Sequence, residues 1–211
     1  MSASIKSAET VGKRAHTKAV NRQAILAAAR QVFARLGFES TTVRDIIRET
    51  NLAAGTFYNY FKSKEEVFEA IANESGRQFR PRLQEVRQSA DNFEQYIEKA
   101  YRAYFEFLNA ANEEPISEGA PHIALIGVRV DTPEMHAIFD EIRMDMERVT
   151  RLSEMPLADS EYLTAAAIGI ARDLGDHMLQ RRPVDVDGAT RFATSLLLNG
   201  VQSLTSGRRQ S

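Results

Sequence analysis

The sequence contains no cysteine, which excludes a disulfide framework and a thiolate metal site. It also lacks any apolar run approaching the roughly 20 residues that a membrane-spanning helix needs. The first 23 residues, MSASIKSAETVGKRAHTKAVNRQ, include basic side chains but no apolar core of a secretory signal. We therefore expect a cytoplasmic protein with no membrane association.

The formal net charge of −2 conceals an uneven distribution of charge along the 211 residues. Residues 1–64 hold 11 lysines and arginines against 4 acidic residues, whereas the remaining residues hold 16 against 25. A basic segment joined to an acidic one is typical of a nucleic-acid-binding module attached to a different module. A solvated lysine-rich surface would give the same balance without any such partner.

Apolar residues follow helical spacing along nearly the whole chain, which predicts an all-α fold of about nine helices. Residues 1–19 are polar, small and basic, and predict a flexible arm. Residues 20–66 predict a domain of three short helices. Residues 67–211 predict a second helical domain, which ends in two helices at about 159–180 and 187–205.

Local signals mark where several of these helices begin, end or bend. Gly37 follows the first apolar pattern, at the position of a C-terminal cap. The run SKEE at 63–66 reads as a capping box, in which a serine oxygen accepts from the third helical amide and the glutamate reaches back. Pro81 lies inside the next helix, so we expect it to kink or divide that helix.

The stretch GTFYNYF, residues 55–61, crowds four aromatic side chains into a helix too short to be stable alone. Phe57 and Phe61 are four apart, so both can face inward and clamp this helix to its neighbours. Another short helix, with Val43 and Ile46 on its apolar face, precedes it by only a few residues. This arrangement predicts a helix-turn-helix, whose second helix enters the DNA major groove.

At this point the sequence resembles the tetracycline-repressor (TetR) family of bacterial transcription regulators. The resemblance covers about residues 20–68 and rests on three ordered segments: FARLGF at 33–38, TTVRDI at 41–46 and GTFYNYFKSKE at 55–65. It implies an N-terminal three-helix DNA-binding domain and a C-terminal helical domain for ligand binding and dimerisation. It further implies a homodimer formed mainly through the last two helices, and a palindromic operator in double-stranded DNA.

The resemblance also implies roles for single residues. Positions matching phosphate contacts are Thr42, Tyr58, Tyr60 and Lys64, and positions matching those that face bases are Arg44, Ala54, Gly55, Thr56 and Asn59. Taken alone, the tyrosines would equally suit the rim of a core and Arg44 a solvated helix face. Ala53 departs from the serine or threonine that often caps the recognition helix, which leaves the amides at that helix start free for a phosphate or water.

The second domain offers candidates for a ligand pocket, although an aromatic stripe at helical spacing also suits a plain core. The candidates are Tyr101, Tyr104, Phe105, His122, Arg129, Phe139, Arg143 and Met146. Their aromatic content predicts an apolar or aromatic small-molecule effector, and Arg129 or His122 could bind an acidic group. We expect no cofactor and no metal site, although His136 with Asp140 and Asp173 with His177 each share a helix face.

Two main classes of function remain open on the sequence. The first is a ligand-responsive DNA-binding regulator, expected to be a repressor that an effector releases from its operator. The second is a small all-helical enzyme, but the chain shows no paired nucleophile and base, no glycine-rich phosphate loop and no dense cluster of metal ligands. We therefore expect no enzymatic activity. An architectural DNA binder without an effector is a third alternative.

Overall fold

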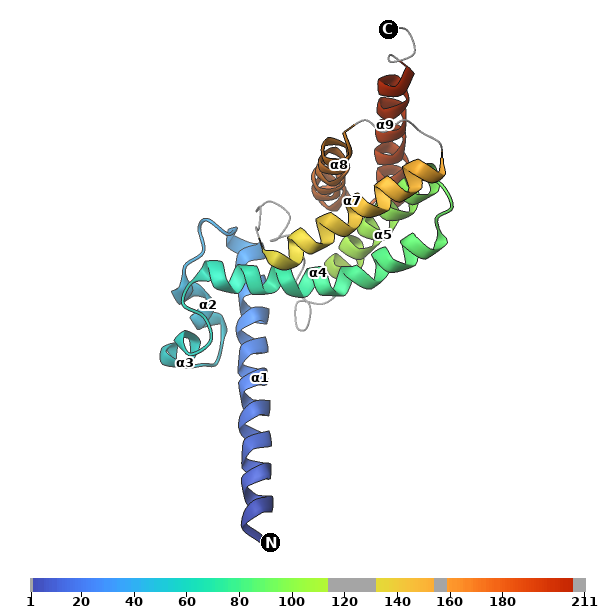
Figure 1. Ribbon diagram of the computed structural model, residues 1–211. Coiled ribbons are helices and arrows are strands. Elements are labelled where there is room, and N and C mark those ends of the chain that lie inside the picture. Colours follow the sequence, from blue (N-terminus) through green and yellow to red (C-terminus); the bar gives the residue numbers. More distant parts are fainter. Residues whose placement is uncertain (1, 114–131, 154–158, 207–211) are drawn as a thin grey trace. The chain divides into compact units, whose positions relative to one another are not determined.

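The computed structural model describes residues 2–113, 132–153 and 159–206. All regular secondary structure in these residues is helical, which confirms the all-α fold class (Figure 1). None of the helices described is long and apolar enough to cross a membrane. The eight described helices are α1 (Ser2–Leu36), α2 (Val43–Glu49), α3 (Ala54–Tyr58), α4 (Lys64–Ser89), α5 (Phe93–Glu113), α7 (Pro133–Leu152), α8 (Ser160–Gln180) and α9 (Val186–Ser206).

Contacts between residues divide the chain into two compact units, and the division along α4 falls between Ile71 and Ala72. The sequence places the domain boundary five residues earlier, after Glu66. Helix α4 therefore contains residues of both units.

Helix α1 begins at Ser2, which corrects the flexible arm predicted for residues 1–19. Extending an existing helix costs much less than starting one. The later part of α1 is anchored by fully buried side chains, Ile25 and Val32 among them. Residues 2–19 contain a single glycine and no proline, so no strong helix breaker stops the helix from extending towards the N-terminus.

Aromatic side chains form much of the core of the first unit. Phe57 and Phe61 are both buried, as predicted, with ring centroids 6.2 Å apart. The rings of Phe33, Phe38 and Phe68 form a second group, with centroids 4.8 to 5.6 Å apart. The second group joins α1 to the start of α4. Burial of Phe57 and Phe61 contributes stability that a helix as short as α3 lacks by itself.

The predicted helix ends are confirmed in part. Gly37 has a φ of +78° and its amide donates to the Phe33 carbonyl at 2.9 Å, as a C-terminal cap requires. The Glu66 amide donates to the Ser63 hydroxyl at 3.3 Å, which is half of the predicted capping box. The Glu66 carboxylate, however, accepts from the amide of Lys62 at 2.7 Å rather than from that of Ser63.

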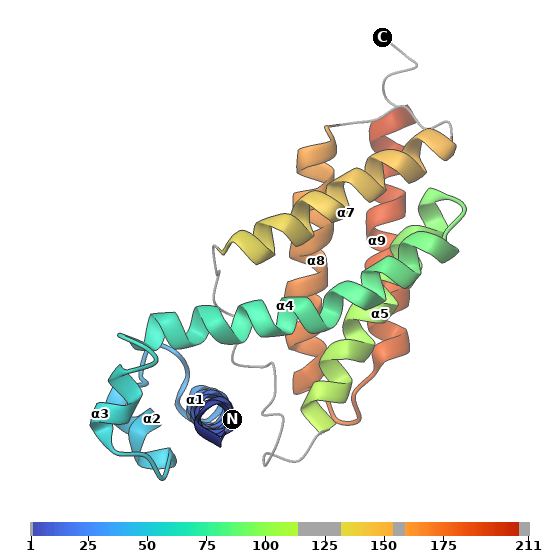
Figure 2. The same ribbon diagram turned by 60° about the horizontal axis from the view of Figure 1, so that its bottom comes forward.

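The second unit is a bundle in which α5 packs against α7, α8 and α9. Figure 2 shows α8 and α9 running side by side. Tyr96 and Phe105 lie fully buried in its core. Gly175 permits a close approach of α8 to α5, because a Cβ atom there would lie 2.6 Å from Cδ1 of Leu108 on α5.

Ion pairs join the second half of α4 to α7. Arg80 pairs with Glu141 and, at 3.4 Å, with Glu134. Arg87 donates from Nε to Asp145 at 2.6 Å and lies 3.5 Å from Glu141. Hydrogen bonding and charge from Arg80 hold the pKa of Glu141 below its ordinary value. Asp145 is buried, so the loss of Arg87 would leave an uncompensated charge in the interior.

Candidate DNA-binding surface and effector cavity

Helices α2 and α3 form the predicted pair with a short turn between them. Thr50 closes α2, since its amide donates to the Ile47 carbonyl at 3.1 Å and its hydroxyl donates to the same oxygen at 2.8 Å. The Leu52 amide in turn donates to the Thr50 hydroxyl at 3.2 Å. Helix α3 begins at Ala54, as predicted, and ends at Tyr58 rather than Tyr60.

The predicted base-facing positions are mostly exposed. Arg44, Ala54, Gly55 and Asn59 are exposed, and Thr56 is half-buried. A Cβ atom at Gly55 would meet nothing within 4 Å, so this part of α3 presents mainly backbone. The surface therefore combines two polar side chains that can reach bases with a small-residue stretch that permits close approach to DNA.

No side chain caps the start of α3. Ala53 stands at the N-cap with no side-chain hydrogen bond, and its carbonyl accepts the Thr56 amide at 2.8 Å. The first amides of a helix have no partners within the helix. The missing cap oxygen therefore leaves room for an external acceptor.

The four predicted phosphate-contacting residues differ in their exposure and in the hydrogen bonds that they already make within the protein. Tyr58 is 58% exposed and Tyr60 is half-buried. Thr42 is exposed, but its hydroxyl donates to the Asp45 carboxylate at 2.5 Å and accepts the Asp45 amide at 3.3 Å. These bonds lower the pKa of Asp45, so Thr42 has first a capping role at α2.

Lys64 is engaged within the first unit. Its Nζ donates to the carbonyls of Phe38 and Glu39, at 2.8 and 3.0 Å, and lies 4.6 Å from the centroid of the Phe38 ring. Two of its three N–H groups therefore hold the α1–α2 turn. Sequence spacing gave no sign of this role, because the partners lie 25 and 26 residues away.

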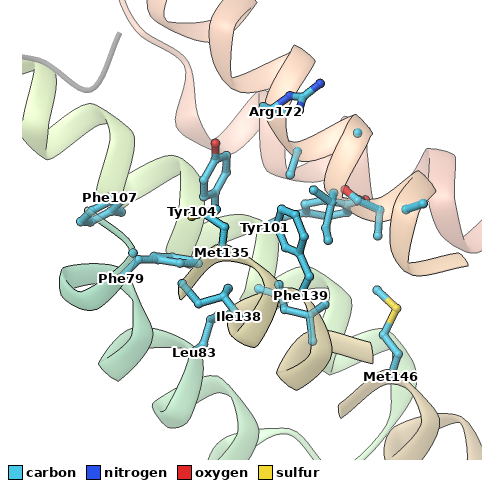
Figure 3. A pocket seen from close by; sticks show the side chains of 18 of the residues that line it. Phe79, Leu83, Tyr101, Tyr104, Phe107, Met135, Ile138, Phe139, Met146 and Arg172 are labelled. Carbon is cyan, nitrogen blue, oxygen red and sulfur yellow. The ribbon is translucent and has the colours of Figure 1, made fainter. Parts of the chain in front are cut away.

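A cavity of about 750 Å³ lies within the second unit, between α4, α5, α7 and α8. Volumes of roughly 300–1,000 Å³ are typical of small-molecule sites. Figure 3 shows its wall of aromatic and aliphatic side chains. Labelled examples from the four helices are Phe79, Leu83, Tyr101, Tyr104, Phe107, Met135, Ile138, Phe139, Met146 and Arg172.

Four of the predicted pocket residues line this cavity, namely Tyr101, Tyr104, Phe139 and Met146. Two others lie elsewhere. Phe105 is fully buried in the bundle core, and Arg143 pairs with carboxylates of its own helix, on Asp140 at 3.3 Å and Glu147 at 3.2 Å. Helical spacing does not show which residues of α5 pack in the bundle core and which border the cavity. It therefore could not place Phe105 in the core. His122 and Arg129 fall outside the described residues.

Sequence reasoning missed the walls supplied by α4 and α8. Phe79 and Leu83 come from α4, and Gly169 and Arg172 from α8. The small residues of α8 were a usable signal. The small side chains of Ala165 and Gly169 leave space that becomes part of the cavity.

Burial governs the ionisation of the tyrosines near the cavity. It raises the pKa of Tyr96, Tyr101 and Tyr104, so all three hydroxyls are neutral and able to donate. Tyr101 donates to the Ala167 carbonyl at 3.3 Å and Tyr96 to Asp145 at 3.4 Å. Burial also raises the pKa of Asp176 to about 6, with a further contribution from the nearby Asp173 carboxylate.

Within the described residues, no three histidine or acidic side chains gather closely enough to hold a metal ion. This covers the pairs His136 with Asp140 and Asp173 with His177, both of which lie in described helices.

Residues 25–71 match the family model described as "Bacterial regulatory proteins, tetR family". Two curated relatives from Bacillus subtilis (strain 168) are named as uncharacterized HTH-type transcriptional regulators, YhgD and YfiR. YhgD is 29% identical over 41% of this chain and 45% of its own length. YfiR is 51% identical over 24% of this chain and 25% of its own length. The chain therefore spans less than half the length of these relatives.

The fold is similar to solved structures over most of the chain. A transcriptional regulator FadR from Bacillus subtilis, solved in complex with stearoyl-CoA, has a TM-score of 0.66 and 18% identity, and the match covers 84% of this chain and 97% of that one. At this identity the likeness concerns the fold alone. It extends beyond the segment that the family model covers and includes the second helical unit.

Proposed function

We propose that this chain, which belongs through residues 25–71 to the tetR family of bacterial regulatory proteins, is a ligand-responsive regulator that represses transcription. It would bind a palindromic operator as a homodimer and be released by a small-molecule effector. Such a regulator acts on the chromosome, in the bacterial cytoplasm. The observation that carries the proposal is the exposed, small-residue face of α3 within a unit whose own aromatic core holds that helix.

DNA contacts are expected to divide into two kinds. Tyr58 and Tyr60 can donate to phosphate oxygens, which carry no base identity. Arg44 and Asn59 are exposed polar side chains on or beside the two helices and can reach base edges. Lys64 would act chiefly by fixing the α1–α2 turn, with one N–H left for a phosphate.

Exposed apolar side chains on α8 and α9 support a homodimer through the last two helices. Tyr162 is 79% exposed, Phe192 59% and Leu196 51%. Large apolar side chains grouped on two adjacent helices favour burial against a partner. A two-fold dimer presents two identical reading helices, which is why a palindromic operator is expected.

The cavity in the second unit supports an apolar or aromatic effector. Its walls are mostly apolar, and α4 both contributes to those walls and leads along the chain into the DNA-binding unit. An effector releases DNA only if it binds the DNA-incompetent state more tightly. A tenfold loss of operator affinity requires about 1.4 kcal/mol of such coupling.

Selection of bound sequences from a random duplex pool tests the proposal. We expect one palindromic sequence, bound more tightly than random DNA, with affinity falling as salt is raised. Binding without sequence preference would indicate an architectural protein. Absence of DNA binding would contradict the proposal and leave the enzyme alternative.

Single substitutions then test the two kinds of contact. Arg44→Ala and Asn59→Ala are each expected to cost about 1–3 kcal/mol of binding, mainly on the selected sequence. Tyr58→Phe should weaken binding to selected and random duplexes alike. Fluorescence anisotropy with both duplexes measures the difference. Equal losses on both duplexes for Arg44→Ala would assign that arginine to the phosphates.

A further inference from the structure

Most of the side chains that line the cavity of the second unit are apolar, and the polar ones are Ser75, Tyr96, Tyr101, Tyr104, His136 and Arg172. Among them, Arg172 on α8 carries a full positive charge, and Tyr104 on α5 carries a neutral hydroxyl. In Figure 3 the guanidinium of Arg172 and the hydroxyl of Tyr104 lie on the same side of the lining side chains that are drawn. Both point away from Phe79, Leu83 and Ile138.

The Tyr104 hydroxyl lies within electrostatic range of two charged side chains of α8. Burial is the main cause of the raised pKa of Tyr104, and smaller contributions come from Asp176, which raises it, and from Arg172, which lowers it. Tyr104 is held in place by edge-to-face packing on Phe79, with ring centroids 5.6 Å apart. Its hydroxyl position is therefore fixed by the wall of the cavity rather than by solvent.

Arg172 stands out among the arginines around the cavity. Arg80, Arg87 and Arg143 all pair with carboxylates, whereas Arg172 makes no hydrogen bond or ion pair within 4 Å to any described residue. A half-buried guanidinium has five N–H donors, and leaving them unpaired is unfavourable. An anion at the end of the cavity would satisfy several of them in a charge-assisted, bidentate geometry.

We infer that the cavity binds an amphiphile, with its apolar body between α4, α5, α7 and α8 and its anionic head on Arg172 and Tyr104. The inference rests on the proposed function only in treating this cavity as the effector site. The head is a carboxylate or a phosphate, both of which match the planar fork of an arginine. Asp176 opposes the head by charge, and burial together with the neighbouring Asp173 raises the pKa of this carboxyl to about 6.

Calorimetric titration of the DNA-free, full-length protein tests the inference. The probes are dodecanoate, dodecyl phosphate and dodecanol, which share one alkyl chain and differ in the head. We expect the protein to bind at least one of the two anions about tenfold or more tightly than the alcohol, which is the range of a charged hydrogen bond. The preference between the two anions identifies the head.

Variants locate the head within the cavity. Arg172→Gln should lose about tenfold or more of the affinity for the anion and leave dodecanol binding unchanged. Tyr104→Phe should lose about fivefold, the value of one neutral hydrogen bond. Asp176→Asn should bind the anion more tightly. Arg151→Gln, which removes an exposed charge near the end of α7 away from the cavity lining, is the matched control and should behave as the wild type.

Unchanged anion affinity in Arg172→Gln would overturn the inference, as would equal losses for anion and alcohol or failure of the wild type to bind any probe. Thermal unfolding of each variant separates local effects from misfolding.

Operator binding is measured in parallel. A wild type that binds the anion but keeps its operator would refute the proposed release mechanism while the inference stands. Operator binding without anion binding would refute only the inference.

Discussion

At the scale of single residues, Lys64 shows how the structure changes the role of a side chain. Its ammonium group donates to two carbonyls of the α1–α2 turn and lies over the Phe38 ring. In a Lys64→Met variant the carbonyls of Phe38, which is half-buried, and of Glu39, which is exposed, would both lose this partner. A role confined to DNA phosphates would instead leave the stability of the free protein unchanged.

We therefore predict that Lys64→Met lowers the free energy of unfolding by about 1–3 kcal/mol. Lys62→Met is the control, because Lys62 is exposed and its side chain makes no hydrogen bond or ion pair to a described residue. Urea denaturation of both variants without DNA measures the difference. Equal midpoints for the two variants would show that the turn does not depend on the ammonium group.

Asp176 predicts a dependence of stability on pH. Its pKa in the folded protein is raised to about 6 from 3.8, first by burial and then by Asp173, with smaller opposing contributions from Arg172 and His177. The folded state therefore holds this proton more tightly than the unfolded state. The stability that the protonated form contributes is complete below about pH 3.8 and is lost as pH rises through about 6.

Accordingly, Asp176→Asn should raise the melting temperature relative to the wild type at pH 7.5, with a smaller gain at pH 4.5. Scanning calorimetry at the two pH values measures this. For Asp173→Asn, at an exposed position on the same helix, the change in melting temperature relative to the wild type should depend less on pH. A gain that is the same at both pH values would mean that the pKa of Asp176 is not raised by folding.

At the scale of helices, two glycines of α8 have opposite packing environments. A Cβ atom at Gly175 would lie 2.6 Å from Cδ1 of the buried Leu108, whereas a Cβ atom at Gly169 would meet nothing within 4 Å. The intrinsic gain from replacing glycine by alanine in a helix is about 1 kcal/mol at either site. Packing must therefore decide the difference between them.

We predict that Gly175→Ala destabilises the protein, because overpacking of about 1–3 kcal/mol exceeds the gain in helix propensity. Gly169→Ala should be neutral or stabilising by up to about 1 kcal/mol. Denaturant unfolding of the two variants measures the comparison. If both substitutions stabilise the protein, Leu108 moves aside at little cost and α8 does not need close contact with α5.

At the scale of the whole molecule, the proposed homodimer depends on apolar side chains that a single chain leaves exposed. Phe192 and Leu196 are four apart on α9, and Tyr162 lies on α8. Burying a large side chain of this kind contributes about 1.5–3 kcal/mol. A charge introduced among them would be desolvated on association without any partner.

Phe192→Glu together with Leu196→Glu should therefore shift the protein towards a monomer in sedimentation experiments at micromolar concentration. Operator affinity should fall with it, because a monomer reads only one half-site. Arg44→Ala is the control, which should weaken operator binding with no change in mass. A double variant that stays dimeric would place the interface on other elements.

The sequence by itself determined most elements of this protein and the family model that residues 25–71 match. The cap at Gly37, the pair α2 and α3 and the inward-facing Phe57 and Phe61 all follow from contacts within a few residues of the chain. The spacing of apolar residues and the identity of single turn residues determine such local preferences. They also locate the last two helices, expected at about 159–180 and 187–205 and observed at Ser160–Gln180 and Val186–Ser206.

Only the tertiary structure decided which side chains meet across distant parts of the chain. Spacing could not tell that Lys64 binds the α1–α2 turn, that Phe105 enters the core while Tyr104 borders the cavity, or that α8 supplies Arg172. Helical periodicity indicates which face of a helix is buried but not which other helix packs against that face. That neighbour is determined by how all the helices of a unit pack together. The same packing leaves the guanidinium of Arg172 beside a largely apolar cavity, with no hydrogen bond or ion pair to a described residue.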